Sequence, residues 1–328
     1  MTTAVLAGAT GLALGVVLAR GGVCLNTGVR RAATAGDLRI PRVFAFALAV
    51  QLLLLPGLVA LGVDPLERNV EAGAPALLPV AQFAGGLVFG AGMALAGGCI
   101  TGILWKAGAG SIATGIAIAG FAGGELLARG PLDSLITSLD SASRPAESGL
   151  AEITGVAYEP LALGLGVLAA AVFLRRSREG LALGAALGLV ASLAWVAADL
   201  SGYGYGLGFT GGAEATRTAI EDGGQLPFQL FLAAGVVAGG AVALRGPVRV
   251  PDAARSVRAL AGGVAMGFGA SLAHGCNIGH GVTGLGLLSV GSALAIAAMV
   301  AGALLTWRYV LARSPTLLGA ERSAPAGQ

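Results

Sequence analysis

The stretch AGGLVFGAGMALAGGCITG (84–102) occurs twice in this 328-residue chain, the second time in altered form. Residues 261–279 read AGGVAMGFGASLAHGCNIG, align with it without gaps and are identical at ten of the 19 positions. Both copies combine an apolar run with regularly placed glycines and include a glycine–cysteine pair near the end. The repeat therefore predicts a chain built from two related halves.

The composition predicts that this chain lies in a membrane. It is 55% hydrophobic and only 11% charged, with a mean hydropathy of +0.83, whereas soluble domains average about 25% charged residues. Its 56 glycines allow helices to approach closely and allow irregular backbone to line a cavity. We expect an all-α polytopic membrane protein whose surroundings are a lipid bilayer, without a nucleic-acid partner.

Nine apolar segments have about the length needed to span a bilayer, with several of them short or interrupted. They are 4–19, 43–63, 80–98, 110–128, 158–174, 181–199, 227–244, 260–275 and 286–307. Four further segments are rich in glycine, too short to cross twice and too apolar for ordinary loops: 21–38, 98–109, 202–224 and 275–285. They predict re-entrant loops or half-helices.

The arginines indicate the orientation. We expect the first apolar segment to be retained as a span. If the N-terminus lies outside, 16 of the 20 lysines and arginines fall on inner segments. Nine crossings then place the C-terminus in the cytoplasm. Four spans in each half and one linking span give two inverted, pseudo-symmetric halves. We expect a first membrane repeat in 1–128, an outer connecting loop in 129–157, a linking helix and the second repeat in 158–311, and a cytoplasmic tail in 312–328.

Three cysteines, Cys24, Cys99 and Cys276, lie in the glycine-rich segments. A single buried cysteine is often only a small apolar residue. Here the local contexts are alike, and the repeat superimposes Cys99 on Cys276, which favours a shared function. A disulfide is unsupported because an odd count leaves one thiol over. Ligand spacings such as CxxC are absent from the sequence, so we expect neither a metal nor a cofactor.

Polar side chains accompany these cysteines. Asn26 and Asn277 each follow a cysteine closely and can donate a side-chain amide. The two histidines of the chain, His274 and His280, bracket the last cysteine. They are either core residues that donate to backbone carbonyls or groups that bind an anion and respond to pH. Lys106, the one lysine, is either an interfacial residue that reaches water or a charge that attracts an anion to the inner mouth.

Buried carboxylates are not expected in the interior. Glu125 and Asp199 lie near the predicted span ends, where water is available, so a proton or sodium site is not evident. The remaining interior groups are thiols, amides, imidazoles and the N–H groups of broken helices, which suit a small anion. Because thiols are weak hydrogen-bond donors, their use favours a soft substrate that contains sulfur or selenium.

Three stretches together resemble the YeeE/YedE family: RGGVCLNTGVRR (20–31), AGMALAGGCITGILWKAGAGS (91–111) and GASLAHGCNIGHGVTGLGLLSVGS (269–292). The run GYGYGLGFTGG (202–212) looks like a further family element, and the resemblance covers nearly the whole chain. It implies nine spans with half-helices and thiosulfate uptake across the bacterial inner membrane. It also implies that Cys24, Cys99 and Cys276 relay thiosulfate through thiol hydrogen bonds.

Other interpretations stay open at this point. The family also occurs beside sulfur-carrier and selenium-metabolism proteins, so the substrate could be another sulfur or selenium species, and a cytoplasmic sulfur-carrier protein is a possible partner. We expect a transporter and not an enzyme. The enzymatic alternative is a membrane sulfurtransferase with Cys276 as nucleophile beside His274. A structural subunit would leave all three cysteines dispensable.

Overall fold

The computed structural model describes residues 2–63, 77–142, 149–176 and 179–311, which form helices joined by turns. The long helices are α1 (Thr2–Gly21), α3 (Arg39–Ala60), α5 (Pro79–Ala96), α7 (Ile112–Arg129), α10 (Tyr158–Arg176), α11 (Leu181–Leu200), α13 (Phe228–Ala243), α14 (Ala253–Ala273) and α15 (Val290–Thr306). The short helices are α2 (Leu25–Ala35), α6 (Ile100–Gly108), α8 (Asp133–Ala142), α9 (Leu150–Thr154), α12 (Gly212–Glu221) and the π-helices η1 (Gly279–Gly284) and η2 (Trp307–Leu311). The predicted tail 312–328 lies outside the described residues.

Membrane-spanning helices dominate the fold. Eight helices of the described residues are long and apolar enough to cross a membrane. The remaining predicted span, 227–244, corresponds to α13, which has 16 residues and is shorter than the others. The polytopic all-α class is therefore confirmed, while the count of nine crossings stays a prediction.

The outer surface of the bundle carries large apolar side chains. Leu54, Phe83, Leu168 and Leu193, from four different helices, are each between 38% and 63% exposed. Soluble monomers rarely expose extended apolar surface of this kind. The exposed leucines are therefore in the place where lipid would cover them, as expected of a multi-pass membrane protein.

Glycines bring α5 and α14 into backbone contact. A Cβ atom added at Gly92 of α5 would lie 2.6 Å from the Gly262 carbonyl oxygen, and one added at Gly269 of α14 would lie 2.5 Å from the Phe89 nitrogen. These helices carry the two copies of the repeat that begin at residues 84 and 261. The repeated glycines thus allow the two copies to pack directly against each other.

The remaining packing pairs occur in corresponding sets. α5 packs on α15 as α14 packs on α7, and α1 packs on α13 as α11 packs on α3. α10, the predicted linking helix, packs on α3. An inverted pseudo-symmetry of the two halves requires such an exchange of partners, and the symmetry itself stays a prediction.

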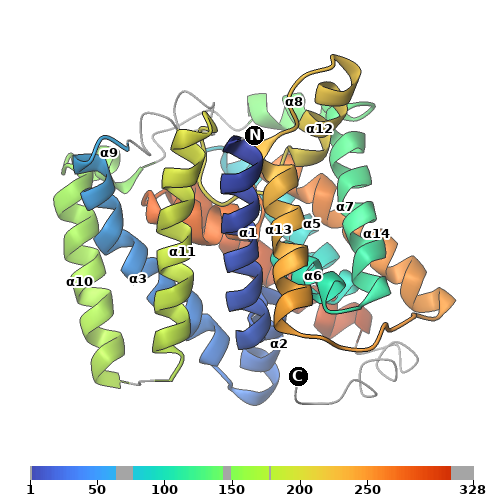
Figure 1. Cartoon of the computed structure of the whole chain (residues 1–328), viewed down its shortest axis with the longest axis horizontal. Coiled ribbons are helices and arrows are strands. Elements are labelled where there is room, and N and C mark those ends of the chain that lie inside the picture. Colours follow the sequence, from blue (N-terminus) through green and yellow to red (C-terminus); the bar gives the residue numbers. More distant parts are fainter. Residues whose placement is uncertain (1, 64–76, 143–148, 177–178, 312–328) are drawn as a thin grey trace.

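Each of the four glycine-rich segments contains a short helix. These are α2, α6, α12 and a helix over 277–286 that includes η1. In Figure 1 the long helices stand side by side, with α8, α9 and α12 at the upper end and α2 at the lower end. α8 and α9 belong to the segment 129–157, which we expected to be a connecting loop.

Close packing of α7 on α14 gives a test of the fold. A Cβ atom at Gly120 would lie 2.5 Å from the Leu260 carbonyl oxygen, whereas one at Gly115 of the same helix meets nothing within 4 Å. We expect Gly120→Ala to lower the free energy of unfolding by ~1–3 kcal/mol through overpacking. Gly115→Ala should leave it unchanged or raise it by up to ~1 kcal/mol, because alanine favours helix. Thermal unfolding in detergent measures both, and equal shifts would contradict this packing.

Candidate functional site

A residue in the left-handed conformation precedes each cysteine by two positions. These residues are Gly22 (φ 61°), Gly97 (φ 75°) and His274 (φ 59°). A left-handed residue ends a helix, and glycine adopts this conformation without a Cβ clash. The three cysteines therefore follow three helix ends at the same distance.

Hydrogen bonds around the three breaks are also alike. The residue before each cysteine donates to the carbonyl five residues earlier: Val23 to Leu18 (2.9 Å), Gly98 to Met93 (3.2 Å) and Gly275 to Ala270 (2.9 Å). Each cysteine carbonyl then accepts from the residue four positions later: Gly28 (2.9 Å), Ile103 (2.8 Å) and His280 (2.9 Å). Each cysteine is thus the residue from which a short helix begins. We call this arrangement of a left-handed residue, one further residue and the cysteine a cysteine turn.

The cysteine turn creates an environment that is rich in donors. The first N–H groups of a helix lack intrahelical partners and carry partial positive charge. All three thiols are fully buried, and each lies beside the backbone N–H of the third residue after it, which is Thr27, Gly102 or Gly279. A helix start of this kind suits an anion, and here it is shielded from water.

Two cysteine turns meet and form what we call the thiol pair. The Sγ atoms of Cys24 and Cys99 are 3.6 Å apart. Cys99 Sγ also contacts Thr101 Oγ1 at 3.3 Å and accepts a hydrogen bond from the Leu25 N–H at 3.4 Å. A Cβ atom at Gly102 would lie 2.5 Å from Cys24 Sγ. The starts of α2 and α6 therefore share one space, which only a glycine at position 102 leaves open.

Lys106 is partly buried and contacts the cysteine turn that contains Cys99. Its ammonium group donates to the Gly97 carbonyl at 3.0 Å and lies 5.7 Å from the centre of the Trp105 ring. Trp105 in turn donates from its indole N–H to the Val23 carbonyl at 3.1 Å. The last turn of α6 thus contacts both cysteine turns and brings a positive charge toward them.

Cys276 has different neighbours, drawn from the stretch Tyr203–Thr210, which we call the tyrosine segment. The backbone of Phe209 and the side chain of Thr210 approach the Cys276 thiol. Two hydrogen bonds fix the segment to the helix after Cys276. Tyr205 donates to the Gly279 carbonyl (2.9 Å), and Thr283 donates to the Leu207 carbonyl (2.7 Å).

Unpaired polar atoms gather beside Cys276. Asn277 is 2% exposed, and neither its side-chain oxygen nor its nitrogen has a hydrogen-bond partner among the described residues. The Thr210 hydroxyl is also buried and unpaired within this part of the chain. A buried polar group without a partner is destabilising by about 1–3 kcal/mol. Buried polar groups without a partner are rare in folded proteins, and a ligand would supply these groups with one.

His280 is held by two protein groups. Its Nε2 atom lies 3.0 Å from the Ala273 carbonyl, which can only accept, so Nε2 carries the proton. Its Nδ1 atom then accepts from the Ser292 hydroxyl at 3.0 Å. Neither ring nitrogen is left for an anion, so the geometry favours the interpretation of His280 as a core residue that donates to a backbone carbonyl.

His274 and Asn26 each contact another side chain of the protein. His274 Nε2 lies 2.8 Å from Asp140 Oδ1, and this contact joins α8 to the end of α14. The Asn26 side-chain oxygen accepts from the Trp307 indole at 3.4 Å. His274 therefore contributes to the site through its left-handed backbone, while Asn26 lies beside the thiol pair at the start of α2.

The expectation that Glu125 lies in water is wrong. It is 1% exposed, and its carboxylate accepts from the backbone N–H groups of Gly211 (2.7 Å) and Ala213 (3.1 Å) at the start of α12. An acidic residue inside an apolar span was the available signal. Its partners lie more than 80 residues away in the sequence, which concealed the contact. Thr210 was missed for a similar reason, because Cys276 lies 66 residues further along the chain. Thr101 was also missed, although it lies only two residues after Cys99.

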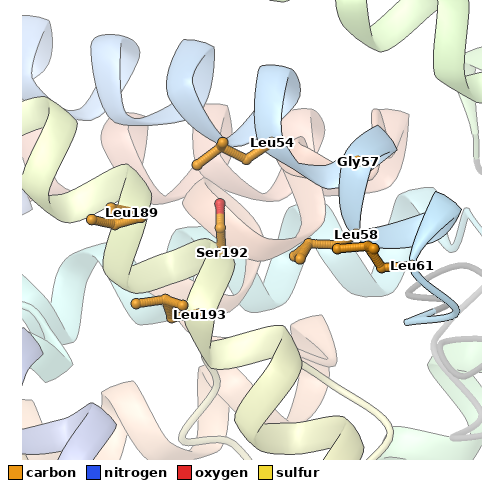
Figure 2. Close-up of a pocket in the computed structure, with 7 residues that line it drawn as sticks. All are labelled: Leu54, Gly57, Leu58, Leu61, Leu189, Ser192 and Leu193. Atoms are coloured by element: carbon orange, nitrogen blue, oxygen red, sulfur yellow. The ribbon is translucent and has the colours of Figure 1, made fainter.

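Two grooves on the described part of the surface have no cysteine in their lining. Figure 2 shows the groove between α3 and α11, whose lining is almost entirely leucine. Its one polar side chain, Ser192, already donates to the Gly188 carbonyl at 3.0 Å. A second groove, between α7 and α14, is lined by apolar residues as well. These grooves suit acyl chains and offer nothing to an anion.

Comparison with known proteins finds a family and relatives that match most of the chain. A family described as sulphur transport matches residues 20–183 and again residues 179–305. The thiosulfate transporter TsuA of Spirochaeta thermophila is 31% identical over 313 residues, covering 87% of this chain and 92% of that protein. The thiosulfate transporter TsuA of Escherichia coli K12 is 29% identical over 303 residues, covering 83% and 84%. The chain therefore belongs to the sulphur transport family, the YeeE/YedE family that its cysteine motifs resemble.

Proposed function

We propose that this protein takes up thiosulfate and relays it between three thiols. The relatives that carry the name thiosulfate transporter support the substrate. The observation that supports the relay is the threefold occurrence of the cysteine turn, each time with a buried thiol beside a backbone N–H group at the start of a short helix. We further propose that the protein acts as a transporter without catalysing a reaction.

The physical requirement is to replace the water around a dianion. Moving a charged group into an apolar interior is very unfavourable unless donors compensate it. At Cys276 these donors are the thiol, the Asn277 amide and the Thr210 hydroxyl. At the thiol pair they are two thiols, Thr101 and the nearby Lys106 charge. Several weak sites in series let an ion bind and leave, as conduction requires.

We call the thiol pair and the surroundings of Cys276 the two stations of the relay. We infer that they lie toward opposite ends of the bundle. The helix after Cys276 leads to Leu288, which accepts from the Leu150 N–H of α9 at 3.0 Å. α6 leads instead to Gly110, which accepts from the Arg249 N–H at 2.8 Å. We infer that Cys276 is the outer station and that the thiol pair is the inner one. The arginine-rich end then faces the cytoplasm in a bacterial inner membrane, and a sulfur-carrier protein is the proposed cytoplasmic partner.

Replacement of the cysteines tests the relay. Cys24→Ala, Cys99→Ala and Cys276→Ala should each slow uptake of labelled thiosulfate into proteoliposomes by about tenfold or more, the factor that ~1.4 kcal/mol produces. Ser192→Ala removes a hydroxyl that lines the leucine groove and donates to the Gly188 carbonyl, and this variant should transport normally. Normal uptake by all three alanine variants would exclude the relay.

The same vesicles separate the alternatives. If the protein is a sulfurtransferase, the Cys276 thiolate should attack the outer sulfur of thiosulfate, break the S–S bond and release sulfite. Cys276 should then carry a persulfide, and labelled ion should not accumulate intact. If the substrate is another sulfur or selenium oxyanion, that ion should inhibit thiosulfate uptake at concentrations below the KM for thiosulfate.

Glycine substitutions at matching positions test the shape of the two stations. A methyl group at Gly102 would lie 2.5 Å from Cys24 Sγ, whereas one at Gly279 would lie 3.7 Å from Cys276 Sγ, which is an ordinary contact. We expect Gly102→Ala to raise the KM for thiosulfate and lower uptake by about tenfold, as for loss of a thiol. Gly279→Ala should change uptake by less than about threefold, because a contact without a clash is worth less than ~1 kcal/mol. Equal effects would argue against a shared space at the thiol pair.

A further inference from the structure

Glu125 is a charged group that the proposed relay does not use. It projects from α7, a helix without a cysteine, and is 1% exposed in an apolar span. Burying an ionised carboxylate is unfavourable by several kcal/mol unless hydrogen bonds compensate it. The groups that Glu125 contacts must therefore compensate the burial of its carboxylate.

Its contacts lie at the end of the tyrosine segment. The two carboxylate oxygens accept separately from the N–H groups of Gly211 and Ala213, at 2.7 and 3.1 Å. Both N–H groups belong to the start of α12, where the helix dipole favours a negative charge. Hydrogen bonds to a charged acceptor are roughly twice as strong as neutral ones. The contact therefore fixes Gly211 firmly relative to α7.

Gly211 is adjacent to Thr210, the residue that reaches Cys276. The tyrosine segment lies between two left-handed glycines, Gly202 (φ 68°) and Gly211 (φ 79°). Cys276 beneath it is fully buried. Hydrogen bonds of Tyr205 and Thr283 attach the segment to the helix after Cys276. The junction of the segment with α12 is attached to α7 through Glu125.

We propose that Glu125 is a positioning residue that holds the tyrosine segment over Cys276 and sets the place of the Thr210 hydroxyl. It acts through Gly211 and does not touch the thiol itself. Its effect on thiosulfate uptake rests on the proposed function, while its effect on the exposure of Cys276 does not.

Glu125→Gln tests this role, because glutamine has nearly the same shape as glutamate but carries no charge. A glutamine oxygen can accept from one of the two N–H groups, and its NH2 group then faces the other donor, so one strong hydrogen bond is lost. Glu125→Asp keeps the charge on a side chain that is one methylene shorter, and it should act in the same direction with a smaller effect. Glu214→Gln is the matched control, because Glu214 lies in the first turn of α12 and pairs with Arg217 on the surface.

The measurement is the rate at which N-ethylmaleimide modifies each cysteine of the full-length protein in detergent, read by peptide mass spectrometry. For Glu125→Gln we expect Cys276 to react about tenfold faster, the change in opening that loss of one charge-assisted bond produces. Cys24 and Cys99 are internal controls and should keep their rates. Glu214→Gln should leave all three rates unchanged.

Two results would overturn the proposal. One is an unchanged Cys276 rate in every folded Glu125 variant, and the other is a parallel rise at all three cysteines, which would indicate general loosening. Should the glutamine variant fail to fold, Gly211→Ala probes the same contact, because alanine is strained at a φ of 79° and turns the N–H away. It should also expose Cys276 selectively.

Transport kinetics then connect the contact to function. Glu125→Gln should raise the KM for thiosulfate several-fold more than it lowers Vmax, because it displaces a donor of the outer station. If Cys276 becomes selectively reactive while the wild-type protein moves no thiosulfate, the positioning role stands and the proposed function fails. If thiosulfate uptake depends on the cysteines while Cys276 labelling is unaffected by the Glu125 variants, the proposed function stands and the positioning role fails.

Discussion

Unpaired N–H groups at the start of a short helix are the constraint on which this structure depends. In an apolar interior such donors need a partner, since water is not there to supply one. The chain meets this need in two ways. A thiol lies at the start of α2, of α6 and of the helix over 277–286, and a carboxylate from α7 lies at the start of α12. A thiol is a weak acceptor that an anion can replace, whereas the carboxylate is itself the anion.

The same repeated sequence builds both the packing and the site. Its first part carries the glycines through which α5 and α14 touch, and its last part carries the left-handed residue and the cysteine. A shift in the crossing of these helices would therefore move Cys99 and Cys276 together. Glycine is needed for close approach at the crossing and for positive φ at the break, so one residue type serves two separate physical purposes.

The sequence predicted what depends on local pattern and missed what depends on distant contacts. Hydropathy and glycine content located eight membrane-spanning helices and the short helices of the four glycine-rich segments, and similar local context grouped the cysteines. Alignment of the repeats related Cys99 to Cys276, yet the neighbour of Cys99 in space is Cys24. That pairing follows from how α2 and α6 pack, which periodicity does not encode. Glu125 looked solvated because it lies near a span end, and only the folded chain brings α12 against it.

The charges of the two stations differ, and this difference determines where a bound dianion is most stable. Near the thiol pair lies the ionised side chain of Lys106, held 3.0 Å from the Gly97 carbonyl. On the side of Cys276, Glu125 already occupies the start of α12. In a medium of low dielectric constant, charge interactions extend over many ångströms. Within the proposed function, an anion at the inner station is therefore more stable than one at the outer station. This preference sets the residence of the ion along the pathway, whereas the direction of net flux follows from concentrations and membrane potential.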